Sequence, residues 1–127
     1  MQYMKDHHRN NYYESGMAGE EAAASYLISE GYEILARNYR YQKAEIDILA
    51  LCENSLAVVE VKTRTIRFYE CLSECISKPK IRRIVMAADH FIRERRLEVE
   101  VRFDIIQLEG KTGAYRITHI KDAFYYF

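Results

Sequence analysis

The side chains best suited to chemistry lie in two short apolar segments of this sequence, on either side of a polar turn. Glu45 and Asp47 belong to the first segment, and Glu60 and Lys62 belong to the second. Both segments are rich in branched residues, so they are predicted to pair as an antiparallel hairpin. A turn centred on residues 53–54 places Asp47 directly opposite Glu60. The same register sets Glu45 opposite Lys62.

Side chains alternate between the two faces of a strand, which predicts that all four polar groups project from one face at one end of the hairpin. The same alternation sorts the apolar residues: Leu49, Leu51, Leu56 and Val58 continue the polar face, and Ile46, Ile48, Val59 and Val61 form the other. The polar cluster therefore borders an apolar surface on both sides of the sheet.

Carboxylates on strands that are apolar on both faces are costly unless they are paired or bind a cation. Carboxylate oxygens are the ligands that hard divalent ions such as Mg²⁺ prefer. The alternative is an ion pair between Glu45 and Lys62, with the other two carboxylates solvated at the end of the sheet. The direct opposition of Asp47 and Glu60 favours the metal site, because unpaired like charges destabilise facing strand positions.

Length and composition predict one domain. The chain has 127 residues, enough for a single packed core, and we expect it over residues 16–127 after a flexible, polar tail over residues 1–15. Nineteen basic residues balance nineteen acidic ones, so the overall charge does not favour a polyanionic partner. No apolar run approaches the ~20 residues of a membrane span. Three cysteines without a secretory signal favour a reduced, cytoplasmic setting.

Hydrophobic periodicity and turn residues predict the order helix, three strands, helix, two strands, which is typical of an α/β sheet covered by helices. The second helix has the clearest signal, since Pro79 suits a first turn and the apolar positions follow a helical period. The predicted elements are a helix over Gly16–Glu30, strands over Tyr32–Tyr39, 45–51 and 56–62, a loop over Thr63–Ser77, a helix over Lys78–Arg95, and strands over Val99–Leu108 and Tyr115–Ile120.

Several motifs in order resemble the YraN family of small bacterial proteins. They are Gly16-x-x-Gly19-Glu20, Gly31-Tyr32, Arg37-Asn38-Tyr39-Arg40, Glu45-Ile46-Asp47-Ile48, Val59-Glu60-Val61-Lys62-Thr63-Arg64, Lys80, Arg102-Phe103-Asp104 and Ala123-Phe124. YraN proteins are predicted endonucleases, distantly similar to archaeal Holliday junction resolvases within the restriction-endonuclease-like PD-(D/E)XK superfamily. The resemblance covers nearly everything from Gly16 onwards. It implies a restriction-endonuclease-like fold with a central mixed sheet flanked by helices.

The resemblance also implies roles for single residues. Asp47 and Glu60 would bind Mg²⁺ or Mn²⁺, helped by the backbone carbonyl of Val61. Glu20 would reach over from the first helix to complete the metal shell. Lys62 would orient or deprotonate the attacking water, or stabilise the charge on phosphorus. These roles agree with the hairpin register, which independently brings two of the carboxylates and the lysine together.

The remaining predicted site residues support the metal site or contact the substrate. Glu45 matches the family pattern, and we expect it to hold Lys62 through a charge-assisted ion pair. The candidate nucleic-acid contacts are Arg64, Arg67, Lys80, Arg82 and Arg83. Exposed cations on a helix are more often simply solvated, so this second set depends on local placement.

Two functions follow from these patterns. The first is a metal-dependent endonuclease that hydrolyses DNA phosphodiester bonds, with branched or junction structures as candidate substrates. The alternative is a non-catalytic module that binds nucleic acid or a protein on a nuclease-like scaffold. The resemblance also suggests a homodimer, because related resolvases act as dimers and a two-fold enzyme suits a four-way junction.

Overall fold

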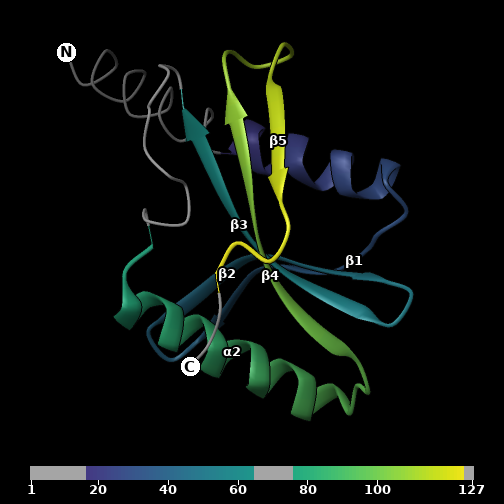
Figure 1. The fold of residues 1–127 in the computed structure, drawn as a ribbon, viewed down its shortest axis with the longest axis vertical. Helices are drawn as coiled ribbons and strands as arrows, with labels where there is room; N and C mark the ends of the chain where they lie inside the picture. Colours follow the sequence, from purple (N-terminus) through teal and green to yellow (C-terminus); the bar gives the residue numbers. More distant parts are fainter. Residues whose placement is uncertain (1–16, 65–75, 125–127) are drawn as a thin grey trace, which may run out of the picture.

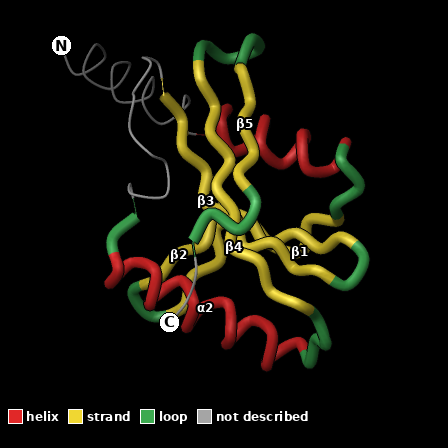
Figure 2. Tube along the Cα trace, viewed as in Figure 1, coloured by secondary structure: helices red, strands yellow, loops and turns green. Residues whose placement is uncertain are grey.

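The structure is a computed structural model that describes residues 17–64 and 76–124 (Figures 1 and 2). Its elements, in order, are a helix over residues 17–29 (the N-terminal helix), β1 (Glu33–Tyr41), β2 (Ala44–Cys52), β3 (Ser55–Arg64), α2 (Lys78–Arg95), β4 (Glu100–Glu109) and β5 (Arg116–Ile120). This order confirms the prediction from the sequence. The predicted tail, residues 1–15, and most of the predicted loop lie outside the described residues.

The five strands form one mixed sheet in the order β1-β2-β3-β4-β5. All neighbours are antiparallel except β3 and β4, which are parallel from Ser55↔Glu100 to Arg64↔Glu109. Parallel neighbours need a long crossover connection, and α2 lies within this one. The crossover brings the start of α2 back towards the strand that carries Glu60 and Lys62.

The two described helices cover opposite faces of the sheet. Ala23, Ala24 and Leu27 of the N-terminal helix pack on one face, in a core with Ile48, Ala50, Ala57, Val59, Ile106 and Leu108. Ile84, Ala87, Ala88 and Phe91 of α2 pack on the other, in a core with Ala44, Ile46, Leu49, Leu56 and Val58. The fold is therefore a three-layer α/β arrangement. No helix in the described part of the chain is long and apolar enough to cross a membrane.

Local sequence explains the ends of α2. Ser77 caps the start, where its hydroxyl accepts a hydrogen bond from the backbone N–H of Lys80 at 3.3 Å. Pro79 lies in the first turn, where its missing N–H costs nothing. Arg96 ends the helix in the left-handed conformation, with φ of 53°. The predicted bounds, Lys78–Arg95, are confirmed.

The hairpin register is also as predicted, but β2 and β3 pair along only part of their length. The pairs run from Cys52↔Ser55 to Ile48↔Val59, so residue numbers sum to 107 as expected. Beyond Ile48 the strands separate: β2 continues with β1, whereas β3 continues with β4. Figure 1 shows β3, β4 and β5 extending away from the β1–β2 pair. The sheet thus splits at the position of Asp47 and Glu60.

The alternation of side chains between the two faces of β2 is interrupted at Asp47. Ile46 and Leu49 both pack in the core under α2, although an uninterrupted strand would put them on opposite faces. Ile48, between them, packs in the core under the N-terminal helix. The alternation therefore inverts once, between Ile46 and Ile48. The prediction that Ile46 shares a face with Ile48 is wrong for this reason.

Strand β1 has a matching irregularity. Its pairs Arg37↔Ile48 and Tyr39↔Ile46 flank Asn38, whose φ of 52° is left-handed. Non-glycine residues rarely adopt this conformation within a strand, and asparagine tolerates it better than most. Asn38 therefore lies across from Asp47. At this level of the sheet, the side chains of both strands switch from one face to the other.

A buried polar network anchors β4 on the face of the N-terminal helix. The side chain of Asp104 is fully buried and accepts hydrogen bonds from Arg102 Nε at 2.9 Å and from His119 Nε2 at 2.7 Å. The hydroxyls of Tyr26 and Tyr32 extend this network to His119 and Arg102. Burial alone would raise the pKa of the Asp104 carboxyl, but these hydrogen bonds hold that pKa below its ordinary value. The Arg-Phe-Asp motif thus has a structural role.

Candidate functional site

Asp47 directs its carboxylate into the gap between the separating strands. Its Oδ2 accepts a hydrogen bond from the backbone N–H of Val61 at 2.8 Å, where a regular ladder would place a backbone carbonyl. Burial and the nearby charge of Glu60 raise the pKa of Asp47 to about 7, although the Val61 N–H works in the opposite direction. The split therefore brings the two carboxylates close together in a poorly solvated place.

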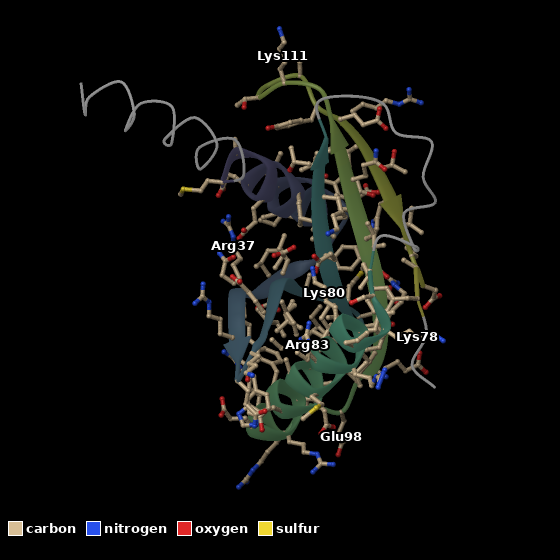
Figure 3. All side chains as sticks on the ribbon, turned by 90° about the vertical axis from the view of Figure 1, so that its left-hand side faces the viewer. Arg37, Lys78, Lys80, Arg83, Glu98 and Lys111 are labelled. Atoms are coloured by element: carbon tan, nitrogen blue, oxygen red, sulfur yellow. The ribbon has the colours of Figure 1, made fainter. Side chains whose placement is uncertain are left out.

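Two lysines hold the second carboxylate. Glu60 is only 6% exposed, and its Oε1 lies 2.7 Å from Nζ of Lys80 and 3.5 Å from Nζ of Lys62. Lys62 follows Glu60 by two positions on β3, whereas Lys80 comes from the first turn of α2. Figure 3 shows Lys80 on α2 beside the strands. Two carboxylates and two ammonium groups thus meet at the split of the sheet.

Glu45 does not support Lys62. Because the pleat inverts at Asp47, Glu45 points away from the face that carries Glu60 and Lys62. It lies across from Arg40 on β1, and its Oε1 is 3.8 Å from Arg40 Nε. In the described part of the chain, Lys62 forms its ion pair with Glu60 instead. The predicted Glu45–Lys62 pair is wrong, since it assumed that β2 and β3 stay paired to their ends.

Glu20 approaches the site from the N-terminal helix but is held by β1. Its Oε1 accepts hydrogen bonds from Asn38 Nδ2 at 2.8 Å and from Arg37 Nε at 3.2 Å. Arg37 also pairs with Glu21 at 2.7 Å. The charge of Glu20 contributes to the raised pKa of Asp47, after burial and Glu60. The described residues contain no group of three His, Cys, Asp or Glu side chains close enough together to hold a metal ion.

Gly19 explains how the helix comes so close to the site. A Cβ atom at this position would overlap Oγ1 of Thr63 on β3 and lie 3.3 Å from Cδ1 of Leu108. Only glycine allows the helix backbone to approach the sheet this closely. The Gly-x-x-Gly-Glu motif thus has a packing reason that places Glu20 beside the strand carrying Lys62.

The candidate nucleic-acid contacts fall into different places. Lys80 belongs to the central cluster through its contact with Glu60. Arg82 and Arg83 are exposed on α2. Arg64 ends β3, and Arg67 lies outside the described residues.

Sequence reasoning missed three contributions to the site. It assigned no role to Arg37 and Asn38, which hold Glu20, and it did not pair Lys80 with Glu60. An asparagine inside a predicted strand was a usable signal, because asparagine favours left-handed backbone. The lysine contact had no comparable signal, since it depends on how the crossover folds back.

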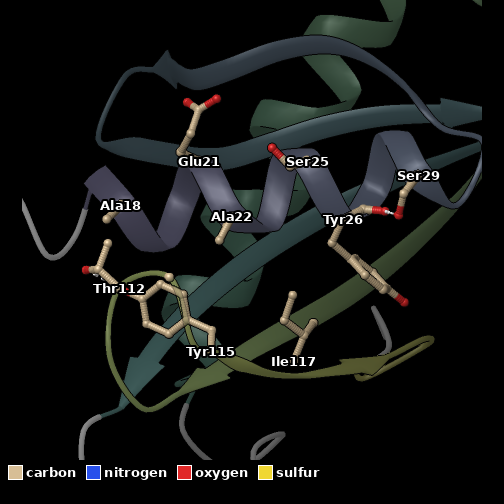
Figure 4. A pocket seen from close by; sticks show the side chains of 10 residues that line it. Ala18, Glu21, Ala22, Ser25, Tyr26, Ser29, Thr112, Tyr115 and Ile117 are labelled. Atoms are coloured by element: carbon tan, nitrogen blue, oxygen red, sulfur yellow. Dashed lines mark hydrogen bonds between the residues drawn. The ribbon is translucent and has the colours of Figure 1, made fainter.

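A hollow lies away from this cluster, between the N-terminal helix and the β4–β5 connection (Figure 4). Its volume is about 650 Å³, and its walls include Ala22, Ser25, Tyr26, Tyr115 and Ile117. Among its lining residues the charged side chain is a carboxylate, that of Glu21, and no cation is present. This hollow therefore does not suit a phosphate.

Comparisons with known proteins identify the family. The family model described as "Uncharacterised protein family UPF0102" matches residues 19–108. A UPF0102 protein of Bacteroides thetaiotaomicron is 48% identical over 112 residues, which cover 88% of this chain and 93% of that protein. One of Christiangramia forsetii is 46% identical over 114 residues, 90% of this chain and 96% of that protein. The structure of Pyrococcus furiosus SfsA in complex with Ca²⁺ covers 83% of this chain and 61% of its own, with 19% identity and a TM-score of 0.34, too low to establish a shared fold. The chain therefore belongs to the UPF0102 family, in agreement with its resemblance to YraN.

Proposed function

We propose that this protein is a metal-dependent endonuclease that hydrolyses phosphodiester bonds in DNA. The observation that carries the proposal is the convergence of Asp47, Glu60 and Lys62 at the split of the sheet. These are the residues to which the motif resemblance assigns metal binding and catalysis. The mixed sheet with helices on both faces is compatible with the proposed restriction-endonuclease-like fold.

The donor set suits a hard divalent cation. Mg²⁺ usually binds proteins through one or two carboxylates, and completes its shell with water and substrate phosphates. Asp47 and Glu60 supply two carboxylates. Burial and then the charge of Glu60 raise the pKa of Asp47, and a bound cation would relieve the repulsion between the two groups. They would hold Mg²⁺ or Mn²⁺ with the Val61 carbonyl, and Glu20 stands near enough to add to the negative field. The bound cation would acidify a water molecule and neutralise phosphate charge.

The lysines have a direct electrostatic role in this proposal. Attack on a phosphodiester increases the negative charge on the non-bridging oxygens, so fixed cations nearby stabilise the transition state. Lys62 and Lys80 place their ammonium groups beside Glu60, and each can turn from the carboxylate to the phosphate when a cation binds there. Lys62 is the stronger candidate for orienting the attacking water, because it lies on the same strand as Glu60 and is the more buried lysine.

The substrate and setting are part of the same proposal. We propose that the protein is cytoplasmic and that its substrate is DNA, with four-way junctions and flaps as candidate shapes. We propose a homodimer as the active form. One observation favours the non-catalytic alternative: Glu60 already has two ammonium partners without a ligand, so this carboxylate is neutralised without a bound cation. A scaffold that binds nucleic acid without cutting it would need no bound metal at Glu60.

Cleavage assays distinguish the two functions. Wild type and Lys62→Ala would be incubated with junction, flap and linear DNA in Mg²⁺ or Mn²⁺, and Lys111→Ala would control for the loss of an exposed lysine. Removing one such electrostatic group typically costs ~3–4 kcal/mol, so Lys62→Ala should lose on the order of a hundred-fold or more in rate. The control should cleave like wild type. If Lys62→Ala cleaves DNA at the full wild-type rate, the nuclease assignment of this site is wrong.

A further inference from the structure

A small pocket beside the candidate site carries unpaired positive charge. It has a volume of about 210 Å³ and lies between the β1–β2 turn and the middle of α2, lined by Tyr41, Gln42, Lys43, Ala44, Arg83 and Met86. Its charged lining residues are both cations. Within the described part of the chain, neither Lys43 nor Arg83 forms an ion pair with a carboxylate. Their hydrogen-bond donors are therefore available to an anion.

The pocket lies next to the candidate site along both α2 and β2. Arg83 follows Lys80 by three positions on α2, so the two side chains are neighbours on the helix surface. Figure 3 shows them one after the other along the same side of α2. Ala44 precedes Asp47 by three residues on β2, which corresponds to about 10 Å at roughly 3.3 Å per residue. A nucleic-acid strand that passes the candidate site can therefore reach the pocket.

The other walls suit the less polar parts of a nucleotide. The ring of Tyr41 is fixed by stacking on His90, with centroids 4.1 Å apart and planes 21° apart. Gln42 donates a hydrogen bond to the Tyr41 hydroxyl at 3.3 Å. Met86 is 53% exposed, although it is a large apolar side chain. Cations interleaved with an aromatic ring and an exposed apolar group are typical of surfaces that bind nucleic-acid strands.

We propose that this pocket binds a backbone phosphate of the nucleic-acid strand that flanks the cleaved bond. Lys43 and Arg83 contact the phosphate, and Tyr41 and Met86 contact the adjoining sugar or base. This inference rests on the proposed function for the position of the cleaved bond. The pocket itself is defined by its own charges and walls, so it can be tested without cleavage.

The test measures DNA binding in EDTA by fluorescence anisotropy, with a labelled duplex and a labelled four-way junction. Lys43→Ala, Arg83→Ala and the double variant would be compared with wild type between about 50 and 200 mM salt. Arg116→Ala is the matched control, because it removes an exposed cation from β5, away from the pocket. Arg83→Gln provides a second, polar replacement, and thermal melts check that each variant is folded.

Each pocket variant should weaken binding by about three- to tenfold and reduce the slope of log affinity against log salt by about 1, as expected for one lost phosphate contact. Arg116→Ala should keep the wild-type slope. The inference is overturned if both pocket variants bind like wild type, or if the control loses as much affinity as they do.

Failure of the pocket and failure of the nuclease proposal give different results. If the pocket variants bind normally while wild type cleaves DNA and Asp47→Ala does not, the pocket assignment alone is wrong. If wild type cleaves nothing but the pocket variants lose affinity, the binding surface is supported and the nuclease proposal is not.

Discussion

Oδ2 of Asp47 accepts the backbone N–H of Val61 at 2.8 Å, across the gap where β2 and β3 separate. A side chain thus takes the place of a backbone carbonyl at the end of the shared ladder. The arrangement keeps the Val61 N–H satisfied while it holds a carboxylate in a poorly solvated position next to Glu60. The result is a carboxyl group with a pKa raised to about 7.

Asp47→Asn should make the metal-free protein more stable at alkaline pH. The native carboxyl has a pKa raised from 3.8 to about 7, so the folded state holds more protons than the unfolded state between these values. Wild-type stability therefore falls as the pH rises through this window, whereas an amide does not titrate and can still accept the Val61 N–H. The shift is 7 − 3.8, or about 3 units, which corresponds to at most roughly 4 kcal/mol at about pH 8.

Urea unfolding in EDTA at about pH 5 and about pH 8 measures this difference. We expect the stability gap between Asp47→Asn and wild type to be wide at the higher pH and to narrow to roughly a third of that size at the lower one, because about pH 5 is still above the unfolded-state pKa of 3.8. Asp89→Asn, at an exposed position that pairs with Arg93, is the control and should show no such pH-dependent gap. An Asp47→Asn protein less stable than wild type at about pH 8 would contradict the account.

Lys80→Ala should strengthen metal binding by the protein alone. The ammonium group of Lys80 lies 2.7 Å from Glu60 Oε1 and would compete with a divalent cation for that oxygen. Its removal should tighten Mn²⁺ binding by up to about tenfold, or ~1.4 kcal/mol. Lys78→Ala, an exposed lysine in the same helical turn, is the control for the change in net charge. Equal effects of the two variants would show that Lys80 does not compete at the site.

Replacing Asn38 should reveal the cost of its left-handed backbone. Alanine at a φ of 52° costs roughly 1–2 kcal/mol, whereas glycine adopts it freely. Both variants lose the hydrogen bond to Glu20. Chemical denaturation should therefore find Asn38→Gly about 1 kcal/mol more stable than Asn38→Ala. At Asn54, which does not have a positive φ, the same pair of substitutions should show no advantage for glycine.

Gly19→Ala should disturb the packing of the N-terminal helix on β3. The added methyl group would overlap Oγ1 of Thr63, and overpacking of this kind costs roughly 1–3 kcal/mol. Thr63→Ala removes that oxygen, so the double variant should recover part of the loss. A double-mutant cycle by urea unfolding gives the coupling between the two positions. Strictly additive effects would mean that the contact does not limit the approach of the helix.

The sequence was sufficient where local signals decide the structure. The turn formers at residues 53–54 set the hairpin register, and Pro79 with the helical period set the start and length of α2. It was insufficient where a regular pattern breaks. The assumption of an unbroken pleat put Glu45 beside Lys62, but the strands separate and the alternation inverts at Asp47.

Contacts between distant segments were the other limit. The pair Lys80–Glu60 joins residues 20 positions apart through a crossover, and its geometry depends on how α2 packs on the sheet. Periodicity identifies the buried face of such a helix but not the strand residue that its first turn meets.

Calorimetric titration of Mg²⁺ or Mn²⁺ into wild type and Asp47→Ala, with Asp89→Ala as the control, tests the central claim most directly. We expect wild type and the control to bind the metal, and Asp47→Ala to lose binding. Binding should also weaken as the pH falls below about 7, because protons then compete for the Asp47 carboxylate. If wild type binds no divalent metal, or if Asp47→Ala binds it equally well, then the carboxylate cluster is structural and the proposed nuclease site is contradicted.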